Sequence, residues 1–200
     1  MIPKIEFRYS DVYDRNYRNS KFIQNYLEEK NQKYPSKKEI LNYIKKAENI
    51  WEEKREKILK EISKISGFEW KEKRIICYVV GVGRPFSDPL TIRTYGRNIN
   101  RFIETLTHEL IHQIFIQNKK EYSKWNNFVL RKYEKEERLT KSHILLSAIH
   151  WKLLEKLRGK IAIEKEIKKY KDSPDYKISW EIVKKEGAEK IIKKFKEITK

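Results

Sequence analysis

The sequence predicts an α+β protein with a short, mostly antiparallel sheet and several helices. Residues 74–80 are rich in β-branched and aromatic side chains and are followed by glycines and a proline, which is typical of a buried strand. Residues 36–67 and much of the chain after residue 100 instead carry apolar side chains at helical spacing. Strand and helix patterns are therefore segregated along the chain, as in α+β proteins.

The N-terminal part has one clear strand and one long helix. Residues 5–9 alternate as in a short strand, whereas residues 10–20 follow no pattern that we can assign. Ser36 begins the long helix, because Glu39 three positions later completes a capping box, and Gly67 is a natural end for it.

After the strand at residues 74–80, a loop rich in glycine and proline leads into residues 90–94. We expect these residues to form an edge strand, because Pro89 suits a sheet edge. The segments with helical spacing that follow are residues 100–117, 125–133, 140–157 and 182–198. We expect residues 1–158 to form one domain and residues 159–200 to form an appended lysine-rich helical segment.

Composition excludes several classes of protein. The 200 residues are 38% hydrophobic and 38% charged, which supplies enough apolar side chains for a core and excludes a disordered chain. The longest apolar stretch, residues 75–83, is less than half of the ~18 residues that span a bilayer. The first residues also lack the apolar segment of a signal peptide. We therefore expect a cytoplasmic protein without a membrane partner.

The formal net charge of +18 raises the question of nucleic-acid binding. The lysines are spread along the chain and alternate with glutamates, which is typical of solvated helices. Basic charge is necessary for binding nucleic acid but is not sufficient. Nucleic-acid binding therefore stays open as an alternative function, and we do not favour it.

The four histidines all lie between residues 108 and 150, and two of them form an HExxH motif from His108 to His112. On a helix these two imidazoles lie about 40° apart and one turn apart, so both can reach one ion at about 2.0–2.1 Å. Glu109 lies about 60° beyond His112, where it can take a proton from a metal-bound water without being a ligand. The alternative is an amphipathic helix whose histidines border the core.

Two protein ligands make a poor zinc site, so a third ligand is expected. The glycine and histidine of the extended HExxH motif are replaced by Phe115 and Asn118. His143 is our first choice, because it faces inward in the first turns of the helix after residue 140. His150 on the same face is an alternative ligand or a donor to a developing oxyanion, and Glu137 is a carboxylate alternative. Both histidines could instead be ordinary core residues.

Several further residues are weaker candidates. Tyr95, Arg97 and Tyr133 could donate to a reaction intermediate, although each is more simply explained as an ordinary surface or core residue. Cys77 could be a fourth ligand that blocks activity, but a thiol in a central strand is more often part of the core. As the single cysteine, it excludes a disulfide within the chain. Glu104, one turn before His108, could orient that imidazole.

The segment Phe-Ile-Glu-Thr-Leu-Thr-His-Glu-Leu-Ile-His resembles the active-site helix of zincin metallopeptidases. The order of strand, edge strand, HExxH helix and later ligand helix is similar to the small gluzincin-like proteins called minigluzincins. This resemblance covers residues 75–157, and only HExxH is specific within it. The chain has no clear downstream glutamate motif of the gluzincin type, and it is equally similar to SprT-like and other intracellular HExxH proteins.

The resemblance implies a zincin-like fold, a Zn²⁺ ion on His108 and His112, and Glu109 as both general base and general acid. It also implies that residues 90–94 pair with an extended peptide. The sequence therefore predicts a zinc-dependent metallopeptidase acting on a peptide or protein substrate. The alternatives are a non-catalytic zinc-stabilised protein and a basic nucleic-acid-binding protein.

Overall fold

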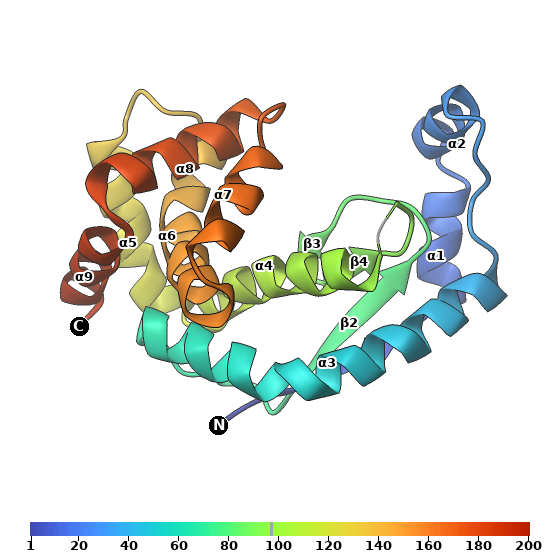
Figure 1. Cartoon of the computed structure of the whole chain (residues 1–200), viewed down its shortest axis with the longest axis horizontal. Helices are drawn as coiled ribbons and strands as arrows, with labels where there is room; N and C mark the ends of the chain where they lie inside the picture. The colour runs from blue at the N-terminus through green and yellow to red at the C-terminus, as the bar shows by residue number, and fades with distance from the viewer. Residues whose placement is uncertain (97) are drawn as a thin grey trace. The chain divides into compact units, whose positions relative to one another are not determined.

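The computed structural model describes residues 1–96 and 98–200, which divide into two compact units. The first unit comprises residues 1–59 and 72–113, and the second comprises residues 60–71 and 114–200. The helices and strands are labelled in Figure 1, and two of the helices contribute residues to both units. No helix within the described ranges has both the length and the apolarity needed to cross a bilayer.

The first unit contains a four-stranded sheet. Its helices lie between the first and second strands and after the last strand in the sequence. Its elements are β1 (Lys4–Arg8), α1 (Asp11–Arg18), α2 (Lys21–Glu29), most of α3 (Lys37–Ser66), β2 (Arg74–Val80), β3 (Phe86–Ser87), β4 (Leu90–Arg93) and α4 (Ile99–Gln117) up to residue 113. The predicted α+β class is confirmed, as are the N-terminal strand and the long helix.

The start of α3 shows why its position could be predicted. The backbone N–H of Ser36 donates to Glu39 Oε2 at 2.7 Å, and the Glu39 backbone N–H donates to Ser36 Oγ at 3.3 Å, which completes the capping box. The helix ends before Gly67, whose φ of 78° is accessible to glycine at little cost.

The sheet is mixed, with the strand order β1-β2-β4-β3. The β1/β2 and β2/β4 pairs are parallel, and only β3/β4 is antiparallel, so the prediction of a mostly antiparallel sheet is wrong. The reason lies in residues 81–89, which we interpreted as one turn. The chain reverses into β3 and reverses again before β4, so that β4 runs in the same direction as β2.

The strand order also corrects the predicted edge. Residues 90–94 begin with β4, which lies between β2 and β3, and the edge strands are β1 and the two-residue strand β3. Phe86 pairs with Thr91 and Ser87 with Leu90. Leu90, Thr91 and Ile92 are buried, as expected for an inner strand.

Asp14 anchors α1 to the sheet. Its carboxylate is fully buried and accepts a hydrogen bond from the Gly81 backbone N–H at 2.9 Å and from the Tyr34 hydroxyl at 2.6 Å. Tyr9 Oη donates to the other carboxylate oxygen at 3.1 Å, and Arg18 pairs with the same oxygen at 3.1 Å. This network joins α1 to the end of β2, because a buried carboxylate needs hydrogen-bond donors around it.

The second unit is helical. Its elements, besides the ends of α3 and α4, are α5 (Lys119–Lys132), α6 (Arg138–Arg158), α7 (Lys160–Lys168), α8 (Pro174–Glu186) and α9 (Ala188–Thr199). The fully buried Phe195 of α9 packs its ring 5.0 Å from that of Phe68 and 5.7 Å from that of Trp125. Residues 159–200 thus form part of this unit's core, and the two units do not divide at the predicted boundary after residue 158.

Candidate metal centre

Helix α4 places the two motif histidines on one face. The rings of His108 and His112 have centroids 5.3 Å apart and planes inclined at 69°. His108 is buried, and His112 is half-buried. Leu106, Leu110 and Ile111 on the same helix are fully buried, so the apolar stripe that predicts the helix also fixes its orientation.

The structure brings His143 of α6 to these two histidines. One ligand atom from each of His108, His112 and His143 lies within 4.8 Å of the other two. Tetrahedral zinc with nitrogen ligands at 2.0–2.1 Å requires nitrogens about 3.3–3.4 Å apart, so a contraction of roughly 1.5 Å at most would complete the site. The three side chains that the sequence singles out are therefore close enough together to bind a metal ion.

The hydrogen bonds of His143 select which of its ring nitrogens can bind a metal. Nδ1 lies 2.8 Å from the Leu139 carbonyl oxygen and 3.0 Å from Ser142 Oγ. A carbonyl oxygen can only accept, so Nδ1 carries the hydrogen and Nε2 keeps its lone pair. Histidines that bind a metal through one ring nitrogen usually donate the N–H of the other ring nitrogen to a carbonyl or carboxylate oxygen.

The surroundings of His143 also favour its neutral form. Burial lowers the pKa of His143, and the Leu139 carbonyl and the Asp175 carboxylate oppose this effect. The Tyr176 ring of α8 lies 4.5 Å from the imidazole, centroid to centroid. A buried, neutral imidazole with a fixed tautomer is in the form that coordinates a metal ion.

Glu109 lies on the same helix as the two motif histidines and is only 8% exposed. Its negative charge acts together with burial to raise the pKa of the Cys77 thiol of β2. Burial is the larger cause, and the thiol is completely enclosed. Cys77 is therefore held as a protonated core thiol, and it does not belong to the metal-ligating group found among the described residues.

The alternative third ligands lie outside the histidine cluster. Among residues 1–96 and 98–200, the group that could hold an ion includes neither His150 nor Glu137. His150 is buried in α6, with its ring 5.9 Å from that of Trp180. Glu137 is exposed and occupies the N-cap position of α6.

The remaining candidates have other surroundings. Tyr133 Oη donates to Glu186 at 2.9 Å, and the half-buried Tyr95 packs its ring 6.3 Å from that of Tyr26. Glu104 is half-buried on α4. Arg97 lies outside the described residues.

Gln113 is a residue of this region that the sequence analysis missed. It directly follows His112, it is 6% exposed, and its Nε2 donates to the carbonyl oxygen of Ser87. This bond ties the HExxH helix to the edge strand β3. The sequence signal for Gln113 was its place within the apolar part of the helix. A buried amide requires a hydrogen-bond partner, so a glutamine there predicts a bond to another element.

The described side chains thus offer three imidazole ligands, and Glu109, which adjoins His108 in sequence, is largely shielded from solvent. Imidazole suits zinc, copper, iron and nickel, so the donor set alone does not identify the metal. Comparison with protein-family models, with curated proteins and with solved structures found no match to this chain.

Proposed function

We propose that this protein is a zinc-dependent metallopeptidase with a zincin-like fold. The observation that carries the proposal is the convergence of His108, His112 and His143, two of which belong to an HExxH motif on a helix. Three protein ligands leave the fourth position of tetrahedral zinc open for water or substrate, which distinguishes catalytic from structural sites. The ligand group in the described part of the chain has three members and includes no thiol.

A zinc ion held by these residues would supply a Lewis acid that lowers the pKa of a coordinated water to about 7 and polarises a carbonyl group. Glu109 adjoins His108 in sequence and lies on the same helix. In the proposed mechanism its carboxylate accepts the proton of the attacking water and later delivers it to the leaving amine. Its low exposure limits competition from bulk solvent for that proton.

The corrected sheet changes where an extended substrate would pair. β3 already pairs with β4 at Leu90 and Thr91, so a peptide cannot pair with β4 there. β3 is the edge strand on the β4 side of the sheet, and the side chain of Gln113 holds it to the HExxH helix. We therefore place an extended peptide along β3, where main-chain hydrogen bonds would give affinity with little sequence selectivity.

Replacing Glu109 by glutamine tests this function. E109Q should bind zinc and fold as the wild type does, but hydrolysis of a mixed fluorogenic peptide library should fall by about 10²–10⁴-fold, the usual contribution of a general acid–base group. E53Q is the matched control, because Glu53 is an exposed helical glutamate on α3. Zinc content is measured by atomic emission, and H108A should lose the metal.

The outcomes separate the candidate functions. Equal hydrolysis by E109Q and wild type would remove Glu109 from the mechanism. Stoichiometric zinc in a wild-type protein that hydrolyses no peptide would favour the non-catalytic, zinc-stabilised alternative. Absence of zinc from the wild-type protein, together with full activity of H108A, would refute the metal site itself.

A further inference from the structure

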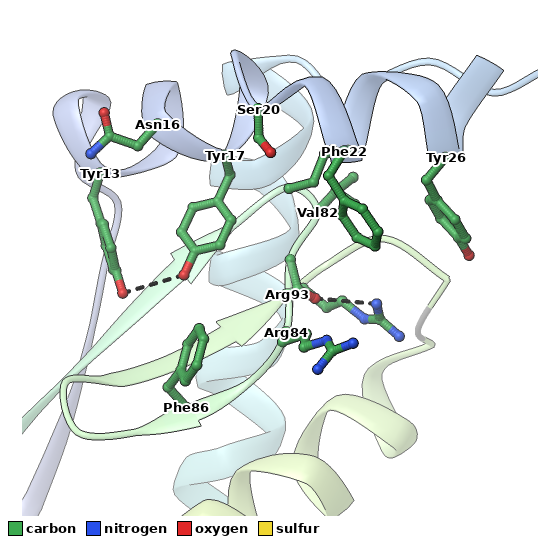
Figure 2. A pocket seen from close by; sticks show the side chains of 12 residues that line it. Tyr13, Asn16, Tyr17, Ser20, Phe22, Tyr26, Val82, Arg84, Phe86 and Arg93 are labelled. Carbon is green, nitrogen blue, oxygen red and sulfur yellow. Dashed lines mark hydrogen bonds between the residues drawn. The ribbon is translucent and has the colours of Figure 1, made fainter. Parts of the chain in front are cut away.

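The first unit contains a cavity of about 630 Å³, and none of the candidate histidines and glutamates named above is among the described residues that line it. Its wall is formed by α1, α2, the loop after β2, and residues of β3 and β4 (Figure 2). The volume is sufficient for a ligand of the size of a dipeptide, since ligand pockets span about 300–1,000 Å³.

Exposed aromatic rings gather around this cavity. Phe22 is 72% exposed, Phe86 46% and Tyr26 37%, although rings of this size are usually buried in a soluble protein. Contiguous apolar side chains on a surface mark binding sites more often than isolated ones do. The cavity therefore suits an apolar group of a ligand.

The opposite wall is fixed by hydrogen bonds. Tyr17 Oη donates to Tyr13 Oη at 3.4 Å (Figure 2). The Tyr13 hydroxyl is in turn bonded to Thr91 Oγ1 at 3.0 Å. The two tyrosine rings meet edge to face, with centroids 5.4 Å apart. A wall held by these contacts keeps its shape without a ligand, which lowers the entropy lost on binding.

Arg93 gives the cavity an uncompensated positive charge. Its Nη1 donates to the Gly83 carbonyl oxygen at 3.2 Å, but its buried Nε has no hydrogen-bond partner among the residues that the structure describes. Within the described ranges it forms no ion pair with a carboxylate, and burial lowers its pKa. A partly buried guanidinium without a counter-ion is unfavourable, so an anion from a ligand would stabilise it.

Arg84 supplies a second positive group to the same cavity. Its side chain is exposed, and no aspartate or glutamate is among the described residues that line the cavity. In Figure 2 both guanidinium groups lie below Phe22, on the side of the view away from Tyr13. Two guanidinium groups beside an apolar chamber suit a carboxylate on an apolar body, because the planar arginine fork pairs with both oxygens of a carboxylate.

We propose that this cavity binds the C-terminal residue of a peptide, with its carboxylate on Arg93 and Arg84 and its apolar side chain among the aromatic rings. The choice of a peptide as the ligand rests on the proposed function and on the course of β3. Phe86 of β3 lines the cavity, and the next residue, Ser87, is bonded to Gln113 beside His112. An extended peptide along β3 would thus have one end in the cavity and run toward the HExxH helix.

The test measures binding without turnover, by isothermal titration of E109Q with four probes. These are N-acetyl-Ala-Phe with a free carboxylate, the same peptide as its C-terminal amide, 3-phenylpropionate and adenosine monophosphate. We expect the peptide acid to bind at least 10-fold more tightly than the amide. R93Q and, separately, R84Q should each weaken binding of the peptide acid by at least 10-fold. F86A should weaken binding of both the acid and the amide.

R74Q is the matched control, because Arg74 carries the same charge on β2, outside the cavity lining, where it pairs with Glu6 at 3.4 Å. Equal binding of acid and amide, or an equal loss in R74Q, would overturn the carboxylate site. Binding of 3-phenylpropionate as tightly as the peptide would assign the cavity to small carboxylic acids, and tighter binding of adenosine monophosphate would assign it to nucleotides. The titration is repeated after bound metal is removed with a chelator. Binding that persists without metal supports the cavity site independently, because absence of the metal would refute the proposed function without abolishing this binding.

Discussion

Zinc should stabilise the fold through His143 and not through His150. Binding to the folded state adds about 2.7 kcal/mol at a free zinc concentration 100 times the dissociation constant. For proteins of 150–250 residues, 1 kcal/mol shifts the melting temperature by about 2–4 °C. The 200-residue chain should therefore melt about 5–11 °C higher after zinc is added to the chelated protein.

The two histidines of α6 provide a matched pair for this experiment. Both are buried, but only His143 belongs to the cluster whose ligand atoms lie within 4.8 Å of one another. H143A should lose most of the zinc-dependent shift, whereas H150A should keep it. Differential scanning calorimetry measures each variant with and without zinc, so that any loss of packing cancels. A shift that survives in H143A and disappears in H150A would refute our ligand assignment.

Two further substitutions test the fold around the sites. Asp14→Ala removes the acceptor of the Gly81 and Tyr34 bonds and should lower the free energy of unfolding by about 3–5 kcal/mol in urea titrations; a loss below about 1 kcal/mol would contradict the anchoring role. Phe195→Ala should lower the unfolding free energy by about 3–5 kcal/mol, because the ring is fully buried against Trp125. An unchanged main transition would instead mean that α9 is an independent appendage.

Features encoded by a few neighbouring residues were predictable from the sequence. The capping box at Ser36 needs only two side chains three positions apart, and the shared face of His108 and His112 follows from helix geometry. Burial of the apolar stripe beside the histidines follows from the same periodicity. These statements hold for any helix with this sequence.

Sheet direction was not predictable in the same way. The parallel pairing of β2 with β4 depends on two chain reversals within residues 81–89, and β3 has only two residues. A strand this short leaves no alternating pattern to detect. The cavity was missed for a related reason, since its aromatic rings and its two arginines come from segments far apart in the sequence.

The third ligand shows where local reasoning stops. His143 and His150 are seven residues apart, so they lie within about 20° of each other on α6 and no periodicity argument can separate them. They are also about 10.5 Å apart along the helix axis, which exceeds the roughly 4 Å that spans two ligands of one ion. Helix geometry thus permits only one of them to join His108 and His112. The periodicity of α6 does not say which of the two is the ligand. The structure selects His143.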